Sequence, residues 1–372
     1  MKEIETNYSK STCQRAICAS ILVRGKITIK NVSLCDDVKY AIELIKKIGC
    51  NCVFENNNLY IDSKNLKYND EILNCGESAT LLRLFIPIGI FLFKKIKLTG
   101  ENRLLERPLI PYEFIFNIEK KKRNIECSGI YRLQKYIIDG TISSQFISGL
   151  LFVLPLLEYD TEIIINGNIG SKNYILLTID VLKKFGINIE FNKNNIFIKG
   201  NQKFLKNIEY INEIDESTQA FYKILNYFGE DIKIGYNEKT KQPDKEIDNI
   251  IVNKPNIIDC DNFPDLVPLL IPLTYSFKYD IIILENVNRL EYKESNRIKA
   301  ILDICKKLNI KIEYNNKDIK IYKSKINSDL ILDTYNDHRI AMMLLIFKKL
   351  TKIDIKNIEV LTKSIPMYKQ FV

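Results

Sequence analysis

One pattern of hydrophobic and polar positions occurs three times along this chain. The copies are AIELIKKIGCNCVFENNNLYI (41–61), IDVLKKFGINIEFNKNNIFI (179–198) and ILDICKKLNIKIEYNNKDIKI (301–321). Each starts with apolar residues at helical spacing and then has a Lys-Lys pair followed closely by Gly or Asn, which is a typical helix end. Two alternating segments around an Asn-rich turn follow. The pattern therefore predicts a helix and a β-hairpin in each copy.

Two weaker copies lie at 114–127 and 220–234. The clear copies are more than a hundred residues apart, which excludes a solenoid. We expect two similar domains, each assembled from several copies of one α-β-β module. A length of 372 residues also suits two domains better than one.

The longest apolar runs, 84–93 and 146–157, are shorter than the ~20 residues of a membrane-spanning helix. We interpret them as core. The N-terminal residues MKEIETNYSKS contain no apolar stretch typical of a signal peptide. Both observations favour a cytoplasmic protein with no membrane partner.

The formal charge of +9 comes from 55 basic and 46 acidic residues, and only 120–123 (KKKR) is a compact basic run. A lysine-rich solvated surface explains most of this charge, although a few arginines are also available for a cleft that binds small anions. Nucleic acid is not expected as a partner, because no basic motif with stacking aromatics is present.

Nine cysteines and a single histidine do not have the spacing of a zinc site. The expected state of the cysteines is buried free thiols. The sequence therefore predicts neither a metal nor an organic cofactor.

Four polar motifs in the first half of the chain have the composition of anion sites. They are SKSTCQR (9–15), CGESATLLR (75–83), TGENRLLERP (99–108) and DGTISSQF (139–146). Serines at a helix start suit a phosphate, and arginines bind phosphate or carboxylate through two N–H groups. Ordinary serine caps, and surface ion pairs of these arginines with Glu101 and Glu106, explain the same residues equally well.

Four further motifs follow in the second half: FPD (263–265), KESNR (293–297), NDHR (336–339) and KSIP (363–366). Asp265 precedes an apolar helix, where it is either a cap or a functional carboxylate. His338, the lone histidine, is more typical of a hydrogen-bonded structural residue than of a catalyst.

These motifs, with GSKNYI (170–175), resemble in order and over nearly the whole chain the signatures of the EPSP synthase family. The resemblance implies an α/β fold of two similar domains, each of three β-α-β-α-β-β units, as an inside-out α/β barrel of the enolpyruvyl transferase type. The first domain is expected at 10–212, and the second at 1–9 with 213–372. The active site is expected in the cleft between them, in a monomer whose domains close on the substrates.

The resemblance also implies the reaction. The enolpyruvyl group of phosphoenolpyruvate is transferred to the 5-hydroxyl of shikimate 3-phosphate by addition and elimination, on the route to chorismate and the aromatic amino acids. No cofactor takes part. Two alternatives stay open: a homologue that binds these substrates without turnover, and UDP-N-acetylglucosamine enolpyruvyl transferase. The second is disfavoured because that family lacks the Ser-Ser-Gln of 143–145 and carries a reactive cysteine in a mobile loop.

The resemblance assigns site residues position by position. The proton-transfer groups are expected to be Asp265 as the base, with Glu294 and Lys10. The residues expected to bind shikimate 3-phosphate are Lys10, Ser11, Arg15, Ser143, Ser144, Gln145, Ser171, Tyr174, Asp265, Arg289 and Lys293. Those expected to bind phosphoenolpyruvate are Lys10, Ala79, Arg107, Gln145, Arg297, Arg339 and Lys363, with Arg83 close by.

Some positions depart from the family pattern. Ala79 stands where glycine is usual, so we expect its methyl group to crowd larger analogues of phosphoenolpyruvate and glyphosate to inhibit poorly. Arg289 occupies a position where asparagine is common. Asn296 occupies a position where aspartate is common. Cys13-Gln14 occupies positions where the family usually has Ser followed by His or Asn.

Overall fold

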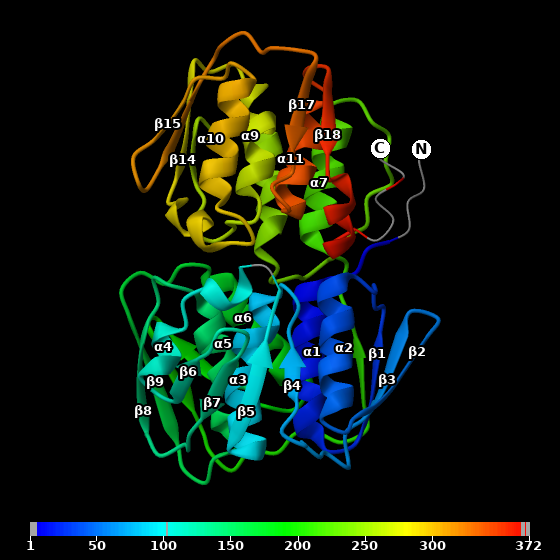
Figure 1. Cartoon of the computed structure of the whole chain (residues 1–372), viewed down its shortest axis with the longest axis vertical. Coiled ribbons are helices and arrows are strands. Elements are labelled where there is room, and N and C mark those ends of the chain that lie inside the picture. The colour runs from blue at the N-terminus through cyan, green and yellow to red at the C-terminus, as the bar shows by residue number, and fades with distance from the viewer. Residues whose placement is uncertain (1–5, 102, 366–368, 370–372) are drawn as a thin grey trace. The chain divides into compact units, whose positions relative to one another are not determined.

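A computed structural model describes residues 6–101, 103–365 and 369 (Figure 1). The other residues include the first five of the predicted second domain, Asn102 of the third motif and Pro366 of the last, so these predictions lie outside the described part. The chain divides into two compact units. The N-terminal unit is Tyr8–Glu213, and the C-terminal unit is Ile214–Val372 with Met1–Asn7. The predicted domain ranges differ by two residues at the first crossing and one at the second, and they stay predictions.

The sheets of the N-terminal unit share one topology. Within its described residues there are three four-stranded sheets, ordered β12-β1-β3-β2, β4-β5-β7-β6 and β8-β9-β11-β10. In each, the first two strands are parallel and the last two form an antiparallel hairpin. The strands are β1 (Lys26–Lys30), β2 (Asn51–Glu55), β3 (Asn58–Asp62), β4 (Ile72–Asn74), β5 (Lys95–Thr99), β6 (Asn117–Lys120), β7 (Ile125–Ser128), β8 (Lys135–Asp139), β9 (Thr161–Asn166), β10 (Glu190–Asn192), β11 (Asn195–Ile198) and β12 (Ile208–Ile211).

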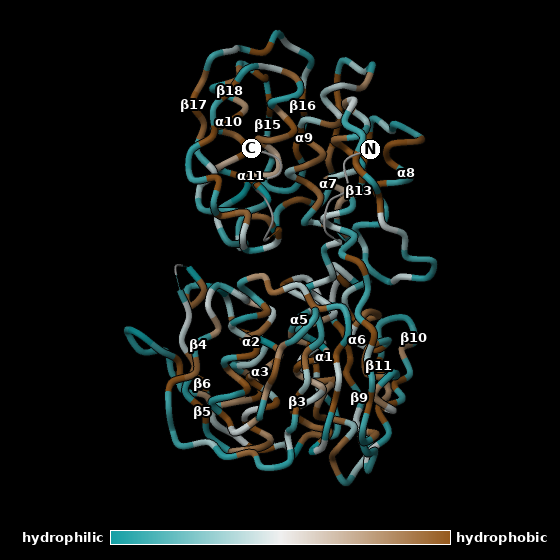
Figure 2. The backbone as a smooth tube through the Cα atoms, turned by 90° about the vertical axis from the view of Figure 1, so that its right-hand side faces the viewer, coloured by the Kyte–Doolittle hydropathy of each residue, from teal (hydrophilic) through white to brown (hydrophobic). Residues whose placement is uncertain are grey.

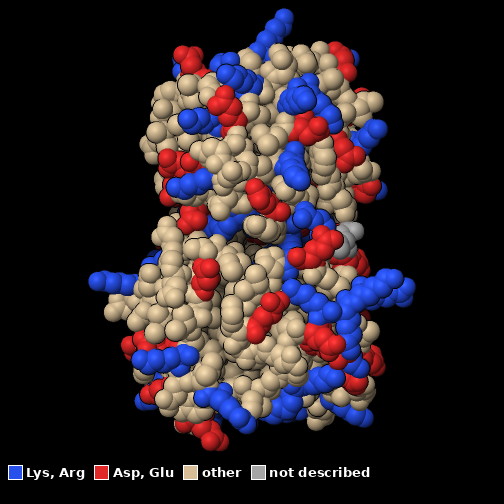
Figure 3. All heavy atoms as spheres, turned by 60° about the vertical axis from the view of Figure 1, so that its left-hand side comes forward, with Lys and Arg blue, Asp and Glu red and all other residues tan. Residues whose placement is uncertain are grey.

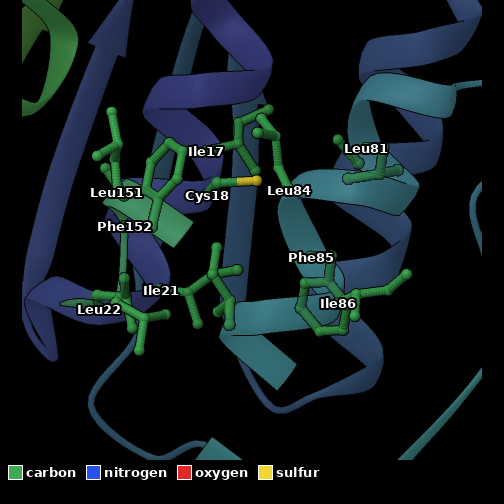
Figure 4. Close-up of a cluster of buried hydrophobic side chains, with 14 of the residues drawn as sticks. Ile17, Cys18, Ile21, Leu22, Leu81, Leu84, Phe85, Ile86, Leu151 and Phe152 are labelled. Atoms are coloured by element: carbon green, nitrogen blue, oxygen red, sulfur yellow. The ribbon is translucent and has the colours of Figure 1, made fainter. Parts of the chain in front are cut away.

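The helices of this unit pack together as its interior. They are α1 (Lys10–Val23), α2 (Asp36–Lys47), α3 (Ala79–Phe93), α4 (Ile110–Glu113), α5 (Ser144–Leu151) and α6 (Lys172–Lys184), with the short 3-10 helices η1 (Leu104–Glu106) and η2 (Leu154–Leu156). Helix α1 is buried from Thr12 to Val23, and its second half, 16–23, is mostly apolar on every side, as expected of a helix inside the unit. Figure 4 shows Ile17, Cys18 and Ile21 of α1 near side chains of α3 and of the end of α5. The predicted apolar runs are therefore core.

The predicted helix-hairpin repeats are confirmed. Helices α2, α6 and α10 (Arg297–Lys307) are followed by the hairpins β2–β3, β10–β11 and β15–β16. Gly49, Gly186 and Asn309, just beyond the Lys-Lys pairs, all have positive φ angles of 95°, 88° and 60°. This left-handed backbone ends each helix, and glycine and asparagine adopt it most readily. In the weaker copy at 114–127 the hairpin β6–β7 is present, but the helix before it, α4, is only one turn long.

The C-terminal unit is less regular. Its strands are β13 (Ile257–Asp259), β14 (Ile281–Glu285), β15 (Ile312–Tyr314), β16 (Ile319–Tyr322), β17 (Leu330–Asp333) and β18 (Ile353–Lys356). The described residues form one four-stranded sheet, β13-β14-β16-β15, and the parallel pair β17-β18. The helices are α7 (Glu216–Tyr227), α8 (Ile247–Asn253), α9 (Val267–Tyr275), α10 and α11 (His338–Phe347), with η3 (Pro243–Glu246), η4 (Asn288–Tyr292) and η5 (Ile358–Lys363). The weak copy at 220–234 therefore has its helix, α7, without a hairpin.

Hydropathy follows this arrangement in both units. Figure 2 shows hydrophobic residues along the packed helices and hydrophilic residues in the outer loops. On the face in Figure 3, lysine and arginine are interspersed with aspartate and glutamate. All nine cysteines are free thiols; eight are buried, and Cys52 is half-buried. No helix within the described residues has both the length and the apolar character needed to cross a bilayer.

Candidate active site

Serine-capped helix starts gather at one end of the N-terminal unit. Ser9, Ser78 and Ser143 precede α1, α3 and α5, and each side chain accepts a hydrogen bond from a backbone N–H of its own first turn. Ordinary capping is thus confirmed for these three. Ser171 precedes α6 with a left-handed backbone, φ 60°. The remaining N–H groups and the positive ends of the helix dipoles favour an anion.

Side-chain hydrogen bonds join the first turns of these helices. Gln14 Nε2 of α1 donates to Ser78 Oγ at 2.8 Å. Arg83 Nη1 of α3 donates to Gln145 Oε1 of α5 at 2.8 Å, and Gln145 Nε2 donates back to Thr80 Oγ1 at 2.8 Å. The motifs 9–15, 75–83 and 139–146, far apart in sequence, therefore meet in one cluster.

Arg15 connects this cluster to α6. Its Nε donates to Thr178 Oγ1 at 2.8 Å, and its Nη1 donates to the Ser11 carbonyl at 2.7 Å. The guanidinium carbon lies 5.8 Å from the ring centroid of Tyr174. Arg15 is only 1% exposed, and this burial lowers its pKa to about 10.

Arg83 is a second buried cation. Its Nη2 donates to the Pro108 carbonyl at 3.0 Å, which brings it to the segment that carries Arg107. Burial, together with the positive charge of Arg107, lowers the pKa of Arg83 to about 9. Neither Arg15 nor Arg83 forms an ion pair with a carboxylate of the described residues. Buried cations without a carboxylate favour a bound anion.

Lys10, the first residue of α1, has a carboxylate partner. Its Nζ lies 3.0 Å from Asp37 Oδ2 at the start of α2, and both side chains are largely buried. Gln14 donates to the backbone carbonyl of Asp37, so the pair adjoins the capped cluster.

A different network surrounds Arg297 in the C-terminal unit. Its Nε donates to Asp337 Oδ2 at 2.8 Å, its Nη1 to Asp265 Oδ1 at 2.8 Å and its Nη2 to Glu294 Oε2 at 2.9 Å. Burial acts to lower the pKa of Arg297, but the three carboxylates outweigh it and raise that pKa. Asn296 caps α10 just before it and accepts from the Lys299 N–H at 3.0 Å. The departure from aspartate at 296 therefore preserves the cap.

Asp265 lies between two cations of this network. Lys293 Nζ is 3.1 Å from Asp265 Oδ1, the same oxygen that Arg297 contacts. Burial acts to raise the pKa of Asp265, but the charges of Lys293, Arg297 and Arg339 hold it well below its usual value. Burial also lowers the pKa of Lys293, against the opposing charge of Asp265. Asp265 is therefore ionised near neutral pH.

Glu294 connects this network to Lys363. Its Oε1 lies 3.5 Å from Lys363 Nζ, and its Oε2 accepts from Arg297. Arg339, at the second position of α11, donates its backbone N–H to Asp337 Oδ1 at 2.8 Å. Motifs 263–265, 293–297 and 336–339 thus converge with Lys363 of the last motif.

Arg289 is a predicted site residue that pairs with Asp261. Its Nη2 donates to Asp261 Oδ1 at 2.6 Å and to the Asp261 carbonyl. His338 is 1% exposed at the start of α11, with Nδ1 3.9 Å from Asp337 Oδ1. No group of three or more His, Cys, Asp or Glu side chains in the described ranges is placed to hold a metal.

The predicted site residues therefore form two clusters. The N-terminal cluster consists of Lys10, Ser11, Arg15, Ala79, Arg83, Arg107, Ser143, Ser144, Gln145, Ser171 and Tyr174. The C-terminal cluster consists of Asp265, Lys293, Glu294, Arg297, Arg339 and Lys363. The ligand assigned to each residue stays a prediction.

Sequence reasoning assigned no role to several residues of the clusters. Asp337 is fully buried between Arg297 and the start of α11, and Asp37 is the partner of Lys10. Asp337 belongs to the NDHR motif, but nothing in the sequence indicates that Arg297 is its partner. Thr178, which holds Arg15, had no sequence signal because it lies 163 positions away.

Comparison with known proteins gives a consistent result. A family model described as EPSP synthase (3-phosphoshikimate 1-carboxyvinyltransferase) matches residues 1–226 and 211–371. A 3-phosphoshikimate 1-carboxyvinyltransferase of Clostridium perfringens is 33% identical over 394 residues, covering 96% of this chain and 92% of the relative. The protein of the same name from Clostridium kluyveri is 33% identical over 395 residues, covering 98% and 92%.

Among solved structures, an EPSP synthase from Acinetobacter baumannii matches with a TM-score of 0.72 at 18% identity, covering 100% of this chain and 94% of the other. Likeness at this identity shows the fold alone. It confirms the predicted fold class, a two-domain α/β fold of the enolpyruvyl transferase type.

Proposed function

The chain belongs to the EPSP synthase (3-phosphoshikimate 1-carboxyvinyltransferase) family, and we propose that it transfers the enolpyruvyl group of phosphoenolpyruvate to the 5-hydroxyl of shikimate 3-phosphate. The products are 5-enolpyruvylshikimate 3-phosphate and inorganic phosphate. The observation that carries the proposal is full-length membership of the family, together with the cationic side chains of the signature motifs that the two clusters contain.

The charges of the clusters suit the two substrates. Each substrate carries a phosphate and a carboxylate, so their approach needs cations to offset the repulsion. The N-terminal cluster, with four helix starts and the buried Arg15 and Arg83, suits shikimate 3-phosphate. The C-terminal cluster, with Arg297, Arg339 and Lys363, suits phosphoenolpyruvate. We propose that both clusters serve one active site in a cleft between the domains.

The reaction requires two proton transfers in each half. In the addition, the 5-hydroxyl oxygen bonds to C2 of phosphoenolpyruvate, Asp265 accepts the hydroxyl proton, and C3 gains a proton to become a methyl group. In the elimination, the methyl group loses a proton as the C2–O bond to phosphate breaks, and the departing phosphate gains the proton that Asp265 had accepted, which regenerates the carboxylate. Glu294 and Lys10 are the proposed groups for the proton on carbon.

The low pKa of Asp265 is compatible with its role as a base. Lys293, Arg297 and Arg339 hold it low. Two bound anionic substrates offset these same cations, so the pKa of Asp265 rises in the ternary complex and the carboxylate becomes a better proton acceptor.

Phosphate release tests the proposal. We expect release only when wild-type protein, phosphoenolpyruvate and shikimate 3-phosphate are all present. Release with UDP-N-acetylglucosamine in place of shikimate 3-phosphate would support the other enolpyruvyl transferase. Calorimetric binding of shikimate 3-phosphate without release would identify a homologue that has lost turnover. The monomeric state and the cytoplasmic location are further proposals, and size-exclusion chromatography with light scattering tests the first.

Glyphosate response tests the assignment of Ala79. This residue is the first of α3 and is 4% exposed, so its methyl group occupies packed space beside the capped cluster. We expect Ala79→Gly to lower the glyphosate concentration for half-inhibition by about tenfold or more, since removing a methyl group admits a bulkier ligand.

The matched control is Ala41→Gly, which removes a buried methyl group from α2 outside the two clusters. Its half-inhibition should equal that of wild type. Equal inhibition of wild type and Ala79→Gly would contradict the assignment of Ala79 to the phosphoenolpyruvate pocket.

A further inference from the structure

Asp244 is a buried carboxylate that neither the motifs nor the proposed mechanism uses. It belongs to η3, which packs against α7, and α7 in turn packs against α11. The side chain is 1% exposed. Its Oδ2 accepts a hydrogen bond from Ser217 of α7, while its Oδ1 is buried with no hydrogen-bond partner. A buried carboxylate oxygen without a partner is unfavourable and calls for a reason.

The opposite charge that acts on Asp244 is that of Arg339, at the start of α11. Arg339 is 2% exposed, and its Nε is also buried with no hydrogen-bond partner. Its Nη1 contacts Met342 Sδ at 3.5 Å, and the guanidinium forms no ion pair within hydrogen-bonding distance of a described carboxylate. Its donors therefore remain for a ligand.

Three carboxylates act on Arg339 by charge. Burial tends to lower the pKa of Arg339, but Asp265, Asp244 and Asp215 outweigh it and raise that pKa. Asp265 is already held by Lys293 and Arg297. The Oδ1 of Asp215 caps α7 by accepting from the Thr218 backbone and hydroxyl. Of the three, only Asp244 has a fully buried oxygen with no hydrogen-bond partner among the described residues.

We propose that Asp244 is the positioning residue of Arg339: anchored by Ser217, its charge holds the guanidinium in place and leaves the arginine donors to the anionic substrate. The inference rests on the proposed function, because it assigns Arg339 to phosphoenolpyruvate.

The protonation behaviour of Asp244 supports this role. Burial raises its pKa to about 6, aided by Asp265 and Asp215 and opposed by the charge of Arg339. An asparagine would accept the same Ser217 hydrogen bond without placing a charge in the interior. A charge kept in an unfavourable place is typical of a functional site.

The test is the Michaelis constant for each substrate in Asp244→Asn. We expect the KM for phosphoenolpyruvate to rise about tenfold, which corresponds to about 1.4 kcal/mol, and the KM for shikimate 3-phosphate to change less than twofold, because only Arg339 loses the opposing charge. Ser217→Ala, which removes the anchor, should shift the same constant in the same direction by a smaller factor. The charge-matched control is Asp248→Asn on α8, whose carboxylate pairs with Lys223 at the surface, and it should leave both constants unchanged.

A double-mutant comparison separates positioning from general damage. In an Arg339→Lys background, Asp244→Asn should add less than a twofold change, because its effect passes through the guanidinium. An unchanged KM for phosphoenolpyruvate, equal shifts in both constants, or full additivity with Arg339→Lys would each overturn the inference.

These outcomes are distinct from failure of the proposed function. If the wild-type protein releases no phosphate, the proposed function is wrong. The inference is then decided by the rise in melting temperature that phosphoenolpyruvate induces, which should be smaller in Asp244→Asn than in wild type.

Discussion

Replacing Asp265 by asparagine is expected to lower kcat about 1,000-fold and to change the KM for phosphoenolpyruvate much less. Asparagine keeps the size of the side chain but cannot accept the proton of the attacking hydroxyl, and such a loss is worth about 10²- to 10⁴-fold. Arg297 retains Asp337 and Glu294 as partners in this variant, so the arginine should stay in place. Steady-state phosphate release measures both constants.

The control for this variant is Asp261→Asn. Asp261 lies in the same segment and also pairs with an arginine, Arg289, but it is outside the C-terminal cluster. We expect its kcat to stay within about threefold of wild type. If Asp265→Asn kept a kcat within tenfold of wild type, another group would have to accept the proton.

Arg297→Met is expected to lower the free energy of unfolding by about 3 to 5 kcal/mol and to abolish phosphate release. The guanidinium is 1% exposed and is the ion-pair partner of Asp337, which is fully buried. Methionine fills similar volume but leaves that carboxylate buried and uncompensated. Urea denaturation followed by circular dichroism measures the change.

Two companion variants define the cause. Lys352→Met removes a cation from an exposed pair with Asp329, and it should hardly change stability. Arg297→Met combined with Asp337→Asn removes both buried charges and keeps a side-chain oxygen to cap α11, so stability should partly return while activity stays lost. A double variant as unstable as Arg297→Met would show that lost packing, rather than an unpaired charge, causes the effect.

Local features of the chain were readable from the sequence because short-range rules govern them. Residues three or four positions apart share a helix face, and residues two apart share a strand face, so the helix-hairpin modules follow from nearby residues alone. The stop signals at Gly49, Gly186 and Asn309 are equally local, since each depends on the backbone freedom of one residue. The serines before α1 and α5 were recognisable as caps for the same reason.

The site was recognised through family resemblance, and its contacts depended on the tertiary structure. Nothing near Arg297 in the sequence indicates that Asp337 is its buried partner, or that Thr178 holds Arg15. The resemblance placed Arg289 in the shikimate 3-phosphate group, which stays a prediction, and only the structure showed its pair with Asp261. Such pairs form when strand order brings distant segments together, as when β12 completes the sheet of β1 about 180 residues away. Which charges face one another, and how far burial moves their pKa values, depends on that packing, because Coulomb energy follows distance and dielectric rather than separation along the chain.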